Sequence, residues 1–279
     1  MRLYAYLIYF FLYFPIAIIV FFSFNSGKHA SDFQGFSFKW YPKLFDNPFL
    51  IDAFNTSLTV ALISAILAST FGTLAAIGLN NLKGKLRVFY DSLVYISVMI
   101  PGIVIGIATL IALVTLFGFL NPLLANIWPE SFGKAPVLNL GYISLIGAHT
   151  LFTMSLSILI VRSRLNGMDR NLIEASNDLY GTPVKTFLKI TLPQLFPAIL
   201  SSFLLSFTFS FDDFIIAFFV AGSETTLPVY VFSSIRRGVT PEINAIATLI
   251  LTFTILLLLA SQLLMKYKNY NNKGLKKWN

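Results

Sequence analysis

The chain has no cysteine, and only 11% of its 279 residues are charged. The lack of cysteine excludes disulfides, thiol catalysis and cysteine metal clusters, although it does not fix a compartment. No Gly-x4-Gly-Lys-Ser/Thr phosphate-binding loop occurs either, so the sequence offers no ATP-hydrolysing site of that kind. With 56% hydrophobic and 16% aromatic residues, the chain cannot build the surface of an ordinary soluble protein. These features predict a membrane protein.

Long apolar runs are what the sequence has instead. A helix needs about 20 apolar residues to cross the bilayer core. Six runs come near that length, at residues 3–24, 57–79, 90–117, 137–161, 196–221 and 244–265. The first run is too long for a typical signal-peptide core and has no small-x-small cleavage site, which favours a retained anchor over a signal peptide. We therefore predict an all-α integral membrane protein with six transmembrane helices in a single domain, 1–279.

The loops between these runs place most of the basic residues on one side of the membrane. If the N-terminus is cytoplasmic, 14 of the 20 Lys and Arg residues fall on that side. The positive-inside rule then puts both termini and the polar loop 162–195 in the cytoplasm. The net charge of +8 needs no nucleic acid to explain it. The basic tail at 266–277 acts either as a topology anchor or as a contact to anionic membrane lipid.

The loop 162–195 carries the pattern of a helical hairpin. Asp169 suits the N-cap of a first short helix, with Glu174 and Asp178 together on the face opposite its apolar side chains. Gly181 suits a left-handed residue that ends this helix. From pattern alone, the hairpin is either an interfacial connector or a docking element.

A second short helix should follow at once. Thr182 offers an N-cap and Pro183 suits the first helical position. We expect this helix to run until Pro193 interrupts it.

The hairpin resembles the EAA motif of bacterial ATP-binding-cassette (ABC) importer permeases, which reads Glu-Ala-Ala, three residues, Gly, nine residues, Ile-x-Leu-Pro. The residues at the family spacing are Glu174, Ala175, Ile190, Leu192 and Pro193. Two positions depart from the motif: Ser176 replaces the second Ala, and Tyr180 replaces the Gly, with Gly181 one place later. The departure at Tyr180 concerns the turn between the two helices.

The resemblance extends over essentially the whole chain. The runs Phe211–Phe214, Leu227–Tyr230, Gly238–Ala245 and Ala260–Leu263 are similar to spermidine/putrescine permease subunits of the PotC type. The resemblance implies the type I ABC importer permease fold in the bacterial inner membrane. It also implies four partners: a second homologous permease, two cytoplasmic ATPase subunits and an extracytoplasmic polyamine-binding protein.

In such an importer this chain would be a non-catalytic permease that binds no cofactor itself. The hairpin would couple it to an ATPase through helix-in-groove contacts. The residues expected to make this coupling are Glu174, Ala175, Asp178, Gly181, Leu192 and Pro193. Related permeases carry other solutes such as iron or thiamine, which is the alternative for the substrate.

Asp212 and Asp213 lie inside the fifth apolar run. An ionised carboxylate at such a depth costs at least about 2.5 kcal/mol unless it is paired or hydrated, and intramembrane acids often mark a transport pathway. Adjacent residues of a helix point about 100° apart, so at most one of the two should face the pathway. Hydrogen bonding to neighbouring helices is the structural alternative. Tyr230 and Phe232 follow the acids and are candidates for stacking on ammonium groups, with simple packing as the alternative.

Other polar residues are open to more than one interpretation. A lone His149 in the fourth run is more typical of packing than of substrate contact. Arg236 and Arg237 break the charge bias and are expected to pair with Glu224 or Glu242, or with acids of the binding protein.

Two other protein classes fit less well. An intramembrane aspartyl protease needs two carboxylates face to face, whereas Asp212 and Asp213 are neighbours on one helix. An inert assembly subunit would tolerate the neutralisation of both acids, which an uptake assay on the double Asn variant tests. No catalytic or metal-ligating set is expected in this chain.

Overall fold

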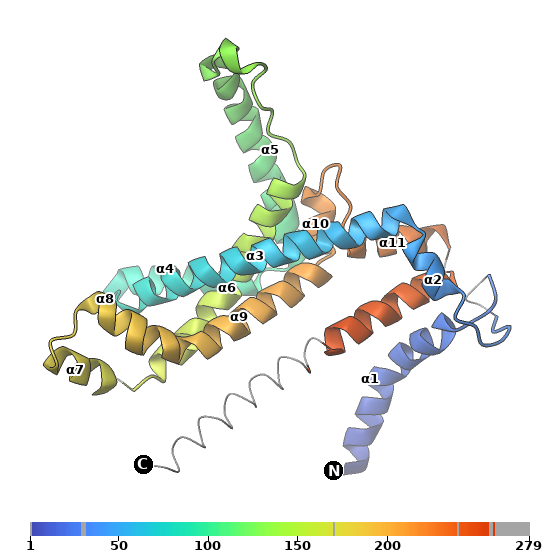
Figure 1. Cartoon of the computed structure of the whole chain (residues 1–279), viewed down its shortest axis with the longest axis horizontal. Coiled ribbons are helices and arrows are strands. Elements are labelled where there is room, and N and C mark those ends of the chain that lie inside the picture. The colour runs from blue at the N-terminus through green and yellow to red at the C-terminus, as the bar shows by residue number, and fades with distance from the viewer. Residues whose placement is uncertain (1, 29–31, 170, 239, 257–258, 260–279) are drawn as a thin grey trace. The chain divides into compact units, whose positions relative to one another are not determined.

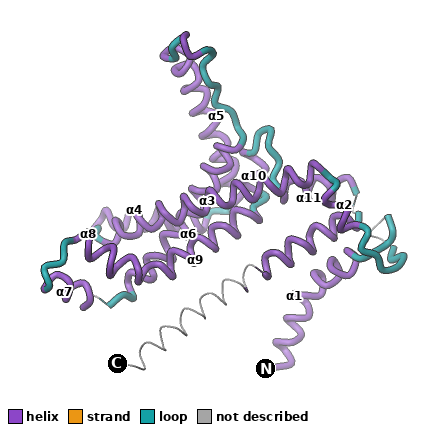
Figure 2. Tube along the Cα trace, viewed as in Figure 1, coloured by secondary structure: helices purple, strands orange, loops and turns teal. Residues whose placement is uncertain are grey.

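The computed structural model describes residues 2–28, 32–169, 171–238, 240–256 and 259. Most of this part is helical (Figure 2). The helices in chain order are α1 (Arg2–Ser23), α2 (Trp40–Phe45), α3 (Pro48–Asn80), α4 (Gly84–Met99), α5 (Gly102–Ile127), η1 (Glu130–Phe132), α6 (Tyr142–Asn166), α7 (Asn171–Asp178), α8 (Pro183–Thr186), η2 (Phe187–Thr191), α9 (Leu192–Asp212), α10 (Ile215–Val220) and α11 (Leu227–Arg237) (Figure 1). A further apolar helix covers Pro241–Leu256.

The chain divides into two compact units. The first contains Met1–Ile51 and Tyr230–Asn279, and the second contains Asp52–Val229. The single domain over 1–279 therefore stays a prediction.

Five described helices are long and apolar enough to cross a membrane. They are Tyr4–Ser23, Pro48–Asn80, Gly102–Ile127, Tyr142–Asn166 and Pro183–Asp212. Pro241–Leu256 is shorter, and the rest of the sixth apolar run, apart from residue 259, lies outside the described residues. The count of six spans and the cytoplasmic placement of both termini remain predictions.

The apolar run 90–117 is not one helix. It is divided between α4 and α5 at Ile100 and Pro101, and α5 continues to Ile127. The break follows from Pro101, because a proline disfavours the helical conformation of the residue before it. Ile100 accordingly has an extended ψ of 133°.

The core of the second unit forms where α3, α6 and α10 meet. Its fully or almost fully buried members are Val60, Leu145, Ala148, Ile216, Ala217, Val220 and Ala221. Small residues bring the backbones close: a Cβ added to Gly72 of α3 would lie 2.5 Å from Cβ of Ser157 in α6. A Cβ on Gly106 of α5 would lie 2.8 Å from the ring of Phe219 in α10. Such close approach is typical of helices packed within a bilayer.

Candidate functional site

The fifth apolar run is interrupted at its two acids. α9 ends at Asp212, Asp213 is extended at φ −70° and ψ 119°, and α10 begins at Ile215. The predicted run 196–221 is therefore two helices. The side chain of Asp213 replaces a backbone acceptor, since its Oδ2 accepts a hydrogen bond from the backbone N–H of Ala217 at 3.0 Å.

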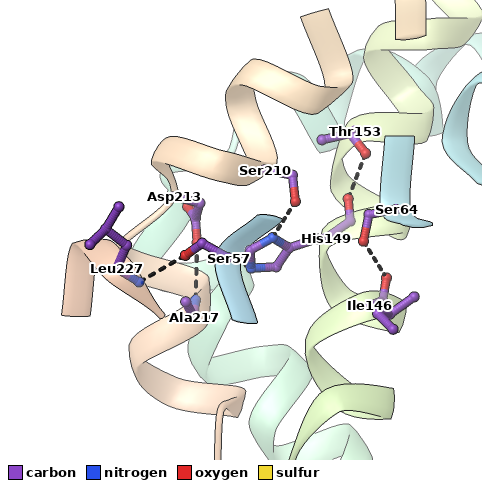
Figure 3. A network of polar contacts seen from close by, with 9 residues as sticks. All are labelled: Ser57, Ser64, Ile146, His149, Thr153, Ser210, Asp213, Ala217 and Leu227. Carbon is purple, nitrogen blue, oxygen red and sulfur yellow. Dashed lines mark hydrogen bonds and ion pairs between the residues drawn. The ribbon is translucent and has the colours of Figure 1, made fainter. Parts of the chain in front are cut away.

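The two acids occupy different surroundings. Asp212 is exposed, whereas the side chain of Asp213 is only 16% exposed. Oδ2 of Asp213 lies 3.6 Å from Nε2 of His149. Figure 3 shows Asp213 and Ser210, from the end of α9, beside His149 of α6. Asp213 thus has structural partners inside the chain, and Asp212 is left at the surface of its unit.

His149 is more than an isolated packing residue. Its side chain is 2% exposed, and its Nδ1 lies 2.7 Å from Oγ of Ser210. Its backbone carbonyl accepts a hydrogen bond from Oγ1 of Thr153 at 2.6 Å. Within the described residues, Nε2 has no hydrogen-bond partner and faces Asp213. From the sequence, His149 is interpreted as an isolated residue, because its contacts with Ser210 and Asp213 arise only when the helices pack.

A row of serines on α9 was missed in the sequence. Ser202, Ser206 and Ser210 are buried and fall four residues apart, which places them on one face of the helix. Oγ of Ser206 lies 3.0 Å from Oγ of Ser157 in α6, and Ser210 contacts His149. The i, i+4 spacing was a readable signal for the α6–α9 interface.

An ion pair between α4 and α6 was also missed. Both terminal nitrogens of Arg162 donate to the Asp91 carboxylate, with Nη2 at 3.0 Å from Oδ2. Arg162 is buried, because α6 continues to Asn166 instead of ending near residue 161. The charge count had treated Arg162 as a loop residue. Two-point contact of this kind fixes the geometry of an Arg–carboxylate pair.

The first helix of the hairpin forms as predicted, but it ends differently. Oδ1 of Asp169 accepts a hydrogen bond from the N–H of Asn171 at 3.0 Å, which confirms the cap. The left-handed residue is Tyr180, with φ 56°, and not Gly181. The N–H of Gly181 bonds to the carbonyl of Ser176 at 2.8 Å, and that of Tyr180 to Asn177 at 3.0 Å. This pair of bonds is the Schellman C-cap, whose left-handed position is Tyr180.

Gly181 is needed for space instead. A Cβ at Gly181 would collide with both the side chain and the backbone oxygen of Ser176. Oγ of Ser176 also lies 2.8 Å from Oγ1 of Thr186, which joins α7 to α8. The serine that replaces the second Ala of the motif therefore closes the hairpin.

The second helix starts as predicted and then continues further. Oγ1 of Thr182 accepts from the N–H of Lys185 at 3.4 Å, which confirms the cap. Pro193 does not interrupt the helix, because it lies in the first turn of α9. The π-helical turn η2 precedes it, and the N–H of Leu192 bonds to the carbonyl of Phe187. A wide turn of this kind accommodates a proline ring that would otherwise clash with the preceding turn.

The outer surface of the hairpin is uncovered in this chain. α7 has no buried residue, and Glu174 and Asp178 are exposed. Leu179 is 82% exposed and Tyr180 is 96% exposed. The hairpin thus presents apolar and acidic side chains together, which suits a protein partner better than water alone.

Tyr230 and Phe232 belong to α11 in the first unit, while Asp212 and Asp213 belong to the second. The hydroxyl of Tyr230 accepts a hydrogen bond from Nδ2 of Asn47 at 2.9 Å, and Phe232 is 40% exposed. In the described part of the chain, no group of three or more His, Asp or Glu residues is placed to hold a metal ion.

Comparison with known proteins finds relatives in sequence and a solved structure of the same fold. The chain is 36% identical over 268 residues to the spermidine/putrescine transport system permease protein PotC of Haemophilus influenzae, covering 96% of each chain. It is 38% identical over 244 residues to the putrescine transport system permease protein PotI of Escherichia coli, covering 86% of this chain and 82% of that one. A bacterial ABC transporter that imports alginate has the same fold, with a TM-score of 0.68 at 17% identity over 92% of this chain and 91% of that chain.

A family match covers most of the sequence. Residues 68–269 match the binding-protein-dependent transport system inner membrane component family. That range contains the hairpin, the broken helix α9–α10 and the α4–α6 ion pair. The chain therefore belongs to this family of multi-pass inner membrane proteins, the permease subunits of ABC importers.

Proposed function

We propose that this chain is the non-catalytic permease subunit of a polyamine importer. The relatives named above are permeases for spermidine and putrescine. In this proposal a second permease completes the pathway, two ATPase subunits bind at the cytoplasmic side, and an extracytoplasmic binding protein delivers the polyamine. Iron or thiamine is the alternative substrate, and no observation in this chain favours it.

One observation carries the mechanism: the second helix of the hairpin begins the same continuous helix that ends at Asp212. The helical stretch Pro183–Asp212 is 30 residues long, which corresponds to about 45 Å at about 1.5 Å per residue. Leu192 and Pro193 lie where the hairpin passes into α9. A displacement of the hairpin by an ATPase would therefore move Asp212 through a rigid element.

The end of α9 has the chemistry of a cation site. The C-terminus of a helix carries partial negative charge on its free carbonyls. Interrupted helices whose C-terminal ends coordinate cations recur in membrane transporters. Asp212 adds a carboxylate at this end and is exposed, so we assign it the contact with a polyamine ammonium group. Asp213 holds the break in shape through Ala217.

The test compares two single substitutions in the reconstituted importer. Asp212→Asn removes the exposed charge, and we expect spermidine uptake to fall at least about tenfold. A hydrogen bond to a charged group is worth about 1.5–3 kcal/mol, and each 1.4 kcal/mol is tenfold. Asp213→Asn keeps an oxygen that accepts from Ala217, so it should retain most of the uptake.

Uptake of labelled spermidine into proteoliposomes measures both variants, with assembled complex quantified by size-exclusion chromatography. Equal uptake by Asp212→Asn and the unmodified importer would rule out the assigned contact. Uptake of an iron complex or thiamine in place of spermidine would overturn the substrate class.

A further inference from the structure

A small polar pocket lies in the first unit, separate from the acids of α9. Its volume is about 220 Å³. Its lining includes Asn47, Tyr230, Thr240, Glu242, Ile243 and Ile246. Sites that enclose a whole drug-sized ligand usually have about 300–1,000 Å³. A pocket of this size therefore suits one end of a longer, flexible molecule.

Asn47 holds the polar groups of this pocket in place. Its Nδ2 donates one hydrogen bond to the hydroxyl of Tyr230 at 2.9 Å and one to Oε1 of Glu242 at 3.1 Å. Its Oδ1 accepts from the backbone N–H of Leu50 at 3.3 Å. Both N–H groups of the amide are thus used inside the protein. The carboxylate and the phenol are oriented before any ligand arrives.

In the part of the chain that the structure describes, no basic side chain forms an ion pair with the carboxylate of Glu242. Arg236, its expected partner, forms no ion pair with Glu242 or Glu224 within the described residues, and the Arg237 side chain lies outside them. The described hydrogen bond to this carboxylate uses Oε1. The pocket therefore combines a half-buried negative charge with further acceptor oxygens on Glu242, Tyr230 and Thr240.

We propose that this pocket binds one terminal ammonium group of the transported polyamine, on the side of the membrane that the positive-inside rule predicts to be outer. An ammonium group has three N–H donors, and a carboxylate with two hydroxyls supplies three acceptors. The ring of Tyr230 adds a surface that attracts cations. A single carboxylate is too few ligands for a calcium or magnesium ion, which take at least six oxygens. The proposal rests on polyamine import as the proposed function.

A binding experiment tests the pocket independently of transport. The purified importer in lipid nanodiscs is irradiated with putrescine that carries an alkyl diazirine, and labelled peptides are mapped by mass spectrometry. We expect labelling within 230–246, suppressed by unlabelled putrescine. Glu242→Gln keeps an oxygen for the bond from Asn47 and removes only the charge, so the putrescine concentration that suppresses half the Tyr230 labelling should rise about tenfold.

Matched variants separate charge from folding. Glu242→Asp restores the carboxylate and should recover most of the affinity, whereas Glu224→Gln, outside the pocket, should change nothing. Absence of labelling in 230–246 in an importer that takes up spermidine would overturn the pocket and leave the proposed function standing. Labelling that depends on Glu242 in an importer without polyamine uptake would support the pocket and count against the proposed function.

Discussion

Tyr180 holds a backbone conformation that bulky side chains seldom adopt. Its φ of 56° places it in the left-handed region, and such a residue costs about 1–3 kcal/mol relative to a glycine. The EAA motif keeps a glycine at this position. The chain retains the C-cap because the bonds from Tyr180 and Gly181 close the turn.

We therefore expect Tyr180→Gly and Tyr180→Asn to stabilise the hairpin by about 1 kcal/mol, since both residues tolerate the left-handed conformation. Tyr180→Ala, which removes the ring but keeps the Cβ, should give no such gain. Hydrogen exchange at the Gly181 amide measures the effect, because this amide bonds to the Ser176 carbonyl. Equal protection in the Ala and Gly variants would mean that the backbone is not strained.

Local signals predicted single residues well where the interaction spans few positions. The caps at Asp169 and Thr182 were predicted because an N-cap contacts the backbone two or three residues ahead. Gly181 was given the wrong role because glycine is the usual left-handed residue. The approach of His149 to Asp213 depends on how α6 packs against α9, which the residues next to His149 in the sequence do not indicate.

Among the elements, α4 and α6 are joined by the Asp91–Arg162 pair. Arg162 is buried, whereas Arg87, which reaches the same carboxylate at 3.7 Å, has a side chain that is 43% exposed. Hydrogen bonds to charged groups contribute about 1.5–3 kcal/mol, while exposed ion pairs contribute about 0–1 kcal/mol. The two arginines thus allow a buried and an exposed contact to the same carboxylate to be compared.

We predict that Arg162→Ala lowers the stability of the purified chain by about 1.5–3 kcal/mol, and that Arg87→Ala lowers it by less than about 1 kcal/mol. The thermal unfolding midpoint in detergent compares the two variants with the unmodified chain. If both substitutions shift the midpoint equally, the buried contact has no special part in joining α4 to α6.

Helix ends were harder to predict than helix existence. The apolar runs located the helices, but the run 90–117 is divided at Pro101, and the run 196–221 is divided at Asp213. Pro101 was a readable signal. The break at Asp213 was not, because a side-chain carboxylate takes over as acceptor for Ala217 only once the helices are packed. At Pro193 the sequence predicts a helix end that does not occur, because the π-helical turn η2 accommodates the proline ring.

At the scale of the whole molecule, composition and motif together predicted the class of protein. The family match and the relatives confirm an ABC importer permease. The sequence could not decide which of the two acids is the better candidate for substrate contact. Asp212 and Asp213 differ in exposure and in partners but not in residue type. The continuous helix Pro183–Asp212 then gives the proposed route from hairpin to acid.

The most direct test of this account reverses the charge of the hairpin with Glu174→Lys and Asp178→Lys together. Both side chains are exposed, so the variant should still insert into the membrane and assemble with its partner permease. Glu174→Gln with Asp178→Asn, which removes the charges without reversing them, is the graded control. The measurement is spermidine uptake, together with ATPase activity stimulated by the binding protein, in proteoliposomes. We predict that the reversed variant loses both activities at normal levels of inserted chain. Retention of both would contradict the claim that this hairpin couples ATP hydrolysis to the movement of polyamine.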